Sequence, residues 1–470
     1  MTEYDLIVLG AGPVGENVAD YAVKGGLSAA LVEQELVGGE CSYWACMPSK
    51  ALLRPPQVIR AAQRVQGAAQ AVTGMLDVGA VLERRNSFTS NWSDQGQVEW
   101  AIGAGIAVVR GHGRLSGVKQ VTVTGTDGTE TLLTARHAVA VATGSDALIP
   151  DIDGLRDARP WTSREATSAK EVPDRLAIIG GGVVATEMAT AYAAFGARVT
   201  LIARSGLLAG MEPFAGEAVA AALREQGATV LVDTETVRVT RAGGEVTVET
   251  KDGLAIVADE VLVATGRAPR TGDIGLDTVG LKPGDWLPTD DTMRVPGYDW
   301  LYAVGDVTHR ALLTHQGKYQ ARAAGDVIAA RAGGRPVDDA AWGRHVATAD
   351  HEAVPQVTFT EPEVASVGLT AKAARDAGYD VRVVDYEIGD VAGAGVREDG
   401  YTGTARMVVD QKRQVIVGMT FVGPDIGDLL QSATIAVVGQ VPIARLWHAV
   451  PSYPTVSEVW LRLLEAYRRD

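Results

Sequence analysis

The feature that most constrains this fold is a strand–glycine–helix unit that occurs twice. In the first unit, the apolar run DLIVLG leads into Gly10, Gly12 and Gly15, which form the pattern G-x-G-x-x-G before a helical stretch. A continuous apolar run is typical of a strand buried on both faces of a parallel sheet. The glycines allow a tight turn, the approach of a pyrophosphate and close helix–strand packing. Glu33 ends the next strand, where its carboxylate can accept hydrogen bonds from a ribose. The unit predicts a dinucleotide site, and a purely structural glycine turn is the alternative.

The second unit is RLAIIGGGVVATEMATAYAAFGARVTLIARSG, in which Gly180, Gly182 and Ala185 fill the three glycine positions. Its second strand ends without a carboxylate, and Arg204 follows Ala203. An arginine at this place can bind the 2′-phosphate of NADPH, and no acid is present to repel that phosphate. The pattern therefore favours NADPH over NADH, whereas a solvated arginine is the plain alternative.

Further segments repeat or change this pattern. Apolar strands lead into ATG at 142–144 and again at 264–266, and LYAVGDV is another buried strand. The segment GRLSGVKQVTVTGTDGTETLLT predicts an antiparallel hairpin layer with DG turns. From about Val354 the strands alternate with helices, and the chain ends in an amphipathic helix. We expect an α/β protein with two Rossmann-like domains and a C-terminal α+β domain.

Composition excludes some classes of function. The chain has 470 residues, 46% of them hydrophobic and 21% charged, as expected for a globular protein. No apolar run reaches the roughly 18–20 residues of a membrane span, and the N-terminus shows no secretory signal, so we expect a cytoplasmic protein. The net charge of −15 argues against a general nucleic-acid binder. Seven scattered histidines give no support to a metal site.

Cys41 and Cys46 are the two cysteines of the chain, and they lie in GGECSYWACMPSK. Five helical steps span roughly 7.5 Å, whereas a disulfide needs Cα atoms within about 7 Å. The two thiols can therefore bridge only if the chain between them is irregular, which the flanking glycines and proline allow. A thiol at a helix start ionises readily. Beside a dinucleotide site the pair suggests an electron relay, and two inert buried cysteines are the alternative.

The motif G-G-x-C-x4-C-x-P-S-K resembles the redox-active disulfide of the class I pyridine nucleotide–disulfide oxidoreductases, which include dihydrolipoamide dehydrogenase, glutathione reductase and mercuric reductase. The resemblance covers the whole chain. It implies an FAD domain at 1–149, an NAD(P)H domain at 150–270, a central domain at 271–345 that completes the FAD site, and an interface domain at 346–470. It also implies a homodimer in which each active site uses both subunits. Cys41 would be the interchange thiol that attacks the substrate, and Cys46 the charge-transfer thiol against the flavin. Lys50 resembles the lysine near flavin N5, and Glu187 its acidic partner, which also borders the NADPH site.

The same resemblance assigns further residues to the cofactors. Asp306 would bind the ribityl chain, and Gly113 the adenine end of FAD. His315 begins a helix near the pyrimidine edge of the flavin, although taken alone it is a structural residue at a helix start. The two ATG segments assign Thr143 and Gly144 to FAD, and Gly266 to NADPH.

The sequence departs from the family in two places. Tyr453 stands in SYPTVSE where relatives carry the acid–base histidine, whereas Glu458, which orients that histidine, is kept. Tyrosine titrates near pH 10, so it can donate a hydrogen bond at neutral pH but is a poor base. His448 is a candidate substitute base, with a surface or packing role as the alternative. Tyr43 and Trp44 replace small residues between the cysteines, where they either offer a flat face to an aromatic acceptor or simply pack.

These observations leave three functional hypotheses. The leading one is an FAD- and NADPH-dependent enzyme that reduces a disulfide acceptor through Cys41 and Cys46. The second is an NADPH:quinone or diaphorase-type reductase that uses the flavin directly, since the histidine is missing. The third is a flavoprotein redox sensor without turnover. No third cysteine exists, which disfavours mercuric reductase and the large thioredoxin reductases.

Overall fold

A computed structural model describes residues 2–469, which form two compact units. Unit 1 comprises the chain up to residue 48 together with residues 86–147 and 267–351. Unit 2 comprises residues 49–85, residues 148–266 and the chain from residue 352 onward. The helices α3 (Cys46–Gln63), α4 (Val78–Phe88) and α10 (Ala349–Glu352) run across the boundaries between these stretches. The domain bounds expected from the sequence stay a prediction.

Unit 1 is built on a sheet in the order β3-β2-β1-β6-β5-β4, with β16 paired to β6. Strands β3, β2, β1, β6 and β16 are parallel, whereas β4 and β5 form the antiparallel layer that the sequence predicts. The strands are β1 (Thr2–Leu9), β2 (Ala29–Glu33), β3 (Ile106–Arg110), β4 (His112–Gly117), β5 (Gln120–Thr124), β6 (Glu130–Val141), β7 (Ser145–Ala147), β15 (Arg267–Pro269) and β16 (Leu301–Ala303). Its helices are α1 (Pro13–Lys24), α2 (Gly39–Tyr43), α5 (Gln95–Gly103) and α9 (Thr314–Ala332).

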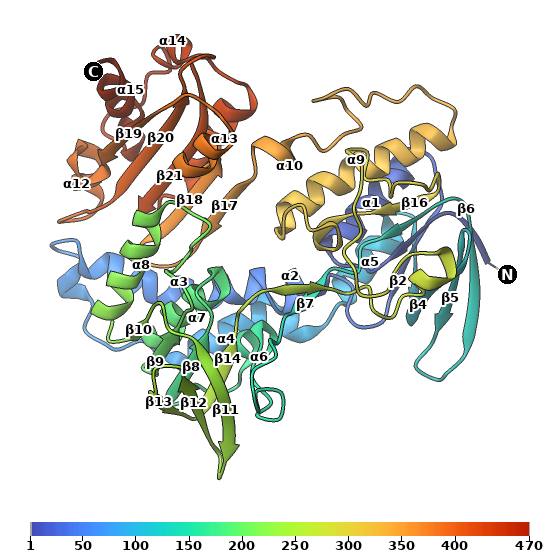
Figure 1. The fold of residues 1–470 in the computed structure, drawn as a ribbon, viewed down its shortest axis with the longest axis horizontal. Coiled ribbons are helices and arrows are strands. Elements are labelled where there is room, and N and C mark those ends of the chain that lie inside the picture. The colour runs from blue at the N-terminus through green and yellow to red at the C-terminus, as the bar shows by residue number, and fades with distance from the viewer. Residues whose placement is uncertain (1, 470) are drawn as a thin grey trace. The chain divides into compact units, whose positions relative to one another are not determined.

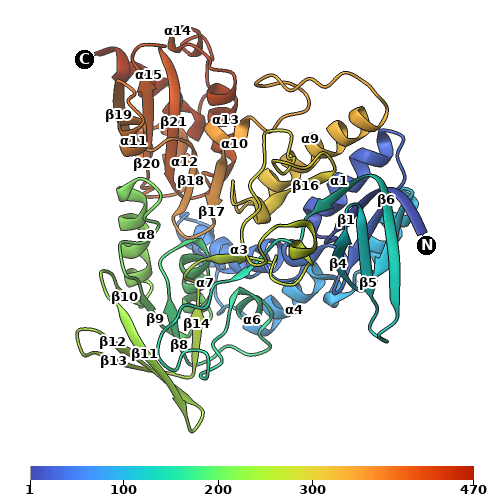
Figure 2. The ribbon, with the colours of Figure 1, turned by 45° about the vertical axis from the view of Figure 1, so that its right-hand side comes forward.

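Both faces of strand β1 are buried, which explains its continuous apolar run. Leu6 and Val8 belong to one core, together with side chains of α1 and α9. Ile7 and Leu9 belong to a second core on the opposite face of the sheet. The helices α1 and α9 lie side by side in both views (Figures 1 and 2). This packing fixes the start of α1, and with it the first glycine turn.

Unit 2 contains a parallel sheet, in the order β10-β9-β8-β14, and an antiparallel sheet, in the order β17-β18-β21-β20-β19 (Figure 1). The strands are β8 (Arg175–Ile179), β9 (Arg198–Ile202), β10 (Thr229–Leu231), β11 (Thr236–Ala242), β12 (Glu245–Thr250), β13 (Ala255–Ala258), β14 (Glu260–Val263), β17 (Pro355–Thr358), β18 (Glu363–Gly368), β19 (Val381–Glu387), β20 (Thr404–Asp410) and β21 (Val415–Gly423). The helices are α6 (Ser163–Ser168), α7 (Val183–Ala194), α8 (Pro213–Glu225), α11 (Ala371–Asp376), α12 (Ala392–Arg397), α13 (Leu430–Val438), α14 (Ile443–Leu446) and α15 (Val459–Arg469).

The second strand–glycine–helix unit is therefore β8, α7 and β9, as the sequence predicts. The C-terminal α+β region also forms as expected, although α15 begins at Val459, after a 3-10 turn at Val456–Glu458. None of the helices that the structure describes has both the length and the hydropathy needed to cross a membrane.

Candidate active site

The first glycine turn of unit 1 admits no side chains at two of its positions. Gly10 has φ +97°, and a Cβ atom there would lie 2.5 Å from the Ala142 carbonyl oxygen. A Cβ atom on Gly15 would lie 2.0 Å from the Gly10 carbonyl oxygen. Gly12 precedes α1 and offers no side chain to cap it. The first backbone N–H groups of α1 are thus available to an anion such as a pyrophosphate.

Glu33 lies beside this turn, at the end of β2. Its Oε2 atom accepts a hydrogen bond from the Ala11 backbone N–H at 2.8 Å, and Oε1 accepts one from the Glu35 N–H at 2.8 Å. Each carboxylate oxygen has a further lone pair that can accept from a ribose hydroxyl. Gly113, on β4, packs against β2, the strand that ends at Glu33, since a Cβ atom on Gly113 would lie 2.7 Å from Val32 Cγ1.

The chain between Cys41 and Cys46 is irregular, as a bridge between them requires. Helix α2 carries Cys41 and ends at Tyr43, and α3 begins at Cys46. Both cysteines are half-buried. The start of α2 approaches the glycine turn closely, because a Cβ atom on Gly39 would lie 2.8 Å from Gly12 Cα. The cysteine segment is therefore held against the predicted dinucleotide site, within one unit.

Cys46 has the surroundings of a stabilised thiolate. It is the first residue of α3, an 18-residue helix whose N-terminal N–H groups favour a negative charge. Its Sγ atom lies 3.2 Å from the hydroxyl of Thr314, the first residue of α9. His315 is the next residue of α9, as the sequence predicts for a helix start. The contact from Thr314 was missed by sequence reasoning, because 268 residues separate it from Cys46.

Asp306 follows β16 in the 3-10 turn Gly305–Thr308. Its Oδ2 atom accepts from the Ser145 hydroxyl at 2.5 Å, and Ser145 Oγ accepts from Arg267 Nε at 2.8 Å. Neither Ser145 nor Arg267 was predicted, although each directly follows an ATG segment, and that position is the signal which would have found them.

Thr143 supplies a further observation about the cofactor. Its Oγ1 atom is buried and makes no hydrogen bond within the described chain. A buried hydroxyl without a partner is costly, so this atom is suited to a polar group of a ligand. Together with the side-chain-free turn at Gly10–Gly15 and the oriented Glu33, it shows that the residues of unit 1 fit a bound dinucleotide such as FAD.

In unit 2, Lys50 and Glu187 form the pair that the resemblance implies. Lys50 Nζ lies 2.8 Å from Glu187 Oε2, and the carboxylate is only 4% exposed. The Phe359 backbone N–H donates to Glu187 Oε1 at 3.0 Å, and the Phe359 ring lies 4.8 Å below the ammonium group. A buried carboxylate with these donors holds the lysine in one position.

The second glycine turn shows the same exclusion of side chains. A Cβ atom on Gly180, which has φ +135°, would lie 2.2 Å from the Ala264 carbonyl oxygen, whereas Gly182 has open space. Gly266 has φ +154°. Ala185, at the third glycine position, is fully buried in α7. The turn therefore leaves the start of α7 open to a pyrophosphate in the same way as the first turn.

Arg204 is exposed one residue beyond the buried Ala203 at the end of β9. Glu235 lies near it: the ion pair with Lys251, at 2.7 Å, is the main cause that lowers the pKa of Glu235, and Arg204 contributes to the same shift. The expectation that no acid lies near the predicted 2′-phosphate site is therefore wrong: the fold brings Glu235 close to Arg204, and Lys251 pairs with that carboxylate.

The C-terminal candidates of unit 2 are Tyr453 and Glu458. The Tyr453 side chain is 76% exposed, and Glu458 is buried. Glu458 Oε1 accepts from Arg462 at 2.5 Å, and Oε2 is buried without a hydrogen-bond partner in the described chain. Arg462, rather than the Tyr453 hydroxyl, therefore holds this carboxylate. His448 is exposed after α14.

Tyr43 packs in the core of unit 1. Its side chain is 1% exposed, its hydroxyl donates to the Val37 carbonyl at 3.1 Å, and its ring meets Trp44 edge-on at 5.6 Å between centroids. Burial raises the pKa of Tyr43 to about 12. A side chain so enclosed offers no face to an acceptor, so the packing alternative applies to Tyr43. Of the two aromatic residues, Trp44 is the one that is half-buried.

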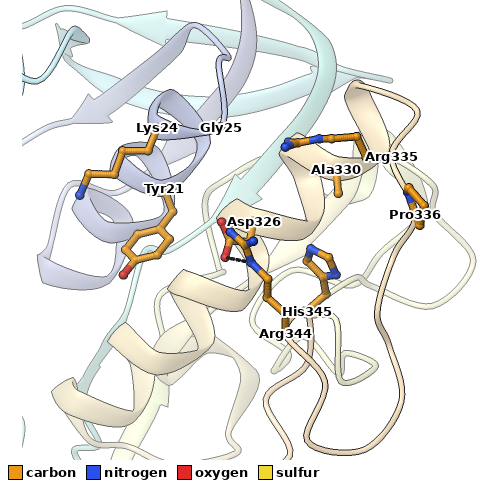
Figure 3. A pocket seen from close by; sticks show the side chains of 9 residues that line it. All are labelled: Tyr21, Lys24, Gly25, Asp326, Ala330, Arg335, Pro336, Arg344 and His345. Carbon is orange, nitrogen blue, oxygen red and sulfur yellow. Dashed lines mark hydrogen bonds and ion pairs between the residues drawn. The ribbon is translucent and has the colours of Figure 1, made fainter.

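A cavity of about 350 Å³ lies at the other end of α1, between that helix, α9 and the segment that follows α9 (Figure 3). It is lined by Tyr21, Lys24 and His345 among others, and Arg344 Nε contacts Asp326 at 3.0 Å across it. The 12 residues of α1 place it roughly 16 Å along the helix from the glycine turn. It is therefore separate from the dinucleotide site.

Comparison with known proteins agrees with this geometry. Residues 4–326 match the family described as pyridine nucleotide-disulphide oxidoreductase, and residues 354–463 match its dimerisation domain. Mercuric reductase of Staphylococcus aureus is 31% identical over 463 residues, which cover 97% of this chain and 81% of that protein. Dihydrolipoyl dehydrogenase of Chlamydia trachomatis is 31% identical over 467 residues, covering 97% and 95%. The flavoprotein disulfide reductase RclA of Escherichia coli, solved as a Cu(II) complex, shares the fold, with a TM-score of 0.84 at 23% identity over 99% of both chains.

Proposed function

The chain belongs to the pyridine nucleotide-disulphide oxidoreductase family, and we propose that it uses NADPH, FAD and the Cys41–Cys46 pair to reduce a small disulfide. Membership makes it a flavoprotein enzyme of this class. When bound, FAD supplies the chemistry that accepts a hydride from the coenzyme and returns electrons in pairs. The observation that carries the proposal is the placement of the cysteine segment, with Cys46 at the start of α3 and Gly39 against the glycine turn.

The two thiols have different roles in this reaction. The Cys41 thiolate attacks one sulfur of the acceptor disulfide, so that a mixed disulfide forms and the other acceptor thiolate leaves. The Cys46 thiolate then attacks the Cys41 sulfur, the Cys41–Cys46 disulfide forms, and the second acceptor thiolate leaves. Two electrons pass to the acceptor, and each leaving thiolate needs one proton. Lys50 and Glu187 form a fixed ion pair, which we place beside the cofactors.

Tyr453 is the group that we assign to proton delivery. The match of residues 354–463 to the dimerisation domain supports a homodimer. In that homodimer we place the exposed Tyr453 of one subunit at the thiols of the other. A tyrosine hydroxyl can donate to a leaving thiolate at neutral pH but cannot hold a proton taken from Cys41. The weakness of tyrosine as a base also favours the second candidate function, which is direct reduction of a quinone. That reaction needs no thiol exchange.

An acceptor screen tests the proposal. The FAD-loaded protein is given NADPH and, in separate assays, glutathione disulfide, lipoamide and a soluble benzoquinone. We expect slow turnover with the disulfides and faster turnover with the quinone. Turnover with the quinone alone, unaffected by replacement of both cysteines, would favour the quinone reductase. No turnover with any acceptor would favour the sensor.

Arg204→Ala is expected to weaken NADPH selectively, because it removes a charge-assisted contact to the 2′-phosphate worth roughly 1.5–3 kcal/mol, or about 10- to 100-fold in affinity. NADH should be little changed. The measurement is KM and Kd for both coenzymes. Arg238→Ala is the matched control, because Arg238 is an exposed arginine of the same unit whose ion-pair partner is Asp153 rather than the predicted phosphate. Equal losses for both coenzymes, or a wild-type preference for NADH, would contradict the assignment.

A further inference from the structure

Arg270 joins three separate stretches of unit 1 at the start of the cysteine helix. Its Nε atom donates to Asp146 Oδ1 at 2.5 Å, and Nη2 donates to Glu40 Oε1 at 2.8 Å. Its backbone N–H donates to the Gly144 carbonyl at 3.0 Å. The side chains of Arg270 and Glu40 are 24% and 19% exposed, so both charges are largely withdrawn from solvent.

Glu40 directly precedes Cys41 in α2. A carboxylate beside a thiol disfavours the thiolate by repulsion of like charges, and a guanidinium bonded to that carboxylate cancels much of the effect. The two cysteines differ in how much a helix N-terminus stabilises their thiolates. Cys46 begins the 18-residue α3, whose N-terminus favours the thiolate, whereas α2 has only five residues and gives Cys41 little such help. The charge near Cys41 is therefore set by neighbouring side chains.

We propose that Arg270 is a positioning residue for Cys41: it fixes the start of α2 and, by neutralising Glu40, sets how readily the Cys41 thiol ionises. Arg270 joins two carboxylates at the start of α2, those of Glu40 and of Asp146 on β7. The inference rests on the proposed role of Cys41 as the attacking thiol. It adds an ion pair, between residues 230 positions apart, that controls the reactivity of that thiol.

The test measures alkylation of Cys41 by iodoacetamide in the FAD-loaded, full-length protein, with Cys46→Ser as the parent so that one thiol reacts. The rate is followed from pH 5.5 to 9.5. Arg270→Gln should slow alkylation roughly 3- to 10-fold at pH 7, because the midpoint of the profile rises by about half to one pH unit. Glu40→Gln should lower the midpoint and speed alkylation. Arg270→Gln combined with Glu40→Gln should return to within about twofold of the parent.

Two further variants complete the design. Asp146→Asn should speed alkylation less than Glu40→Gln, and it keeps the proposal testable if Arg270→Gln does not fold. Arg114→Gln is the control for loss of one positive charge. Arg114 lies on β4 and pairs with Asp273, so its replacement should leave the profile unchanged. A rate that falls equally at every pH, with an unchanged midpoint, would overturn the electrostatic role and leave a structural clamp. A double variant of Arg270 and Glu40 in which alkylation of Cys41 stays slow would also overturn the electrostatic role. Alkylation needs no acceptor, so failure of disulfide turnover with the pH shifts intact would count against the proposed function alone.

Discussion

Replacing Cys46 by serine is expected to abolish NADPH-dependent disulfide reduction, by at least roughly 10³-fold in kcat, because no second thiol remains to release the acceptor from Cys41. The long-wavelength absorbance of a thiolate beside the flavin should also be lost on reduction. Cys41→Ser should show that absorbance without any reductant, because Cys46, at the start of α3, is then a thiolate that cannot form the disulfide. Both readouts are taken anaerobically on the FAD-loaded protein.

The double variant, Cys41→Ser with Cys46→Ser, is the control for this experiment. It should bind FAD normally and keep quinone reduction within a few-fold of the wild type, because electrons can leave the flavin without thiol exchange. A double variant that still shows the long-wavelength absorbance would contradict the assignment of Cys46. Disulfide reduction that survives in Cys46→Ser would remove the cysteine pair from the reaction.

Tyr453→His is expected to raise reduction of small disulfides about 10- to 100-fold, which reaches the lower end of the 10²- to 10⁴-fold that general acid–base help supplies. An imidazole can hold the proton of Cys41 at neutral pH, which a tyrosine cannot. Glu458 has an oxygen that can accept a hydrogen bond from this imidazole, because its Oε2 atom is buried and makes no hydrogen bond within residues 2–469. Quinone reduction should stay within a few-fold. The measurement is kcat/KM for glutathione disulfide and lipoamide across pH.

Tyr453→Phe tests whether the Tyr453 hydroxyl acts as a proton donor. If the hydroxyl delivers the proton to the leaving thiolate, the phenylalanine variant should lose most of the remaining disulfide activity and keep quinone reduction. A wild type that already reduces a small disulfide at roughly 10 s⁻¹ or faster would show that Tyr453 is an adequate acid. If Tyr453→His gains nothing, the barrier lies elsewhere. Trp44 is then the next residue to replace, because Tyr43 is enclosed in the core.

Local patterns in the sequence predict the parts of the site that depend on neighbours along the chain. The glycine turn at Gly10 is an example, because its backbone conformation and its lack of space both demand glycine. The break between α2 and α3 is another, since a bridge between Cys41 and Cys46 requires it. Such features follow from covalent geometry and from periodicity, which a single sequence carries.

Contacts between distant residues could not be predicted in the same way. The pair formed by Glu40 and Arg270 exists because β15 pairs with β7, which brings the residue after β15 to the start of α2. Likewise, Arg462 binds the carboxylate of Glu458, which the resemblance would have orient the residue at position 453. Burial also decides the role of Tyr43, for which the sequence leaves two alternatives open. Each of these outcomes depends on tertiary packing rather than on local pattern.

We infer that the Cys41–Cys46 pair stores electrons between the flavin and the acceptor. An anaerobic titration with dithionite counts these electrons without any acceptor. The wild type should take up about four electrons per FAD, two for the flavin and two for the disulfide, and the double serine variant about two. A wild type that takes up about two electrons, the same as the double variant, would show that the cysteine pair stores none.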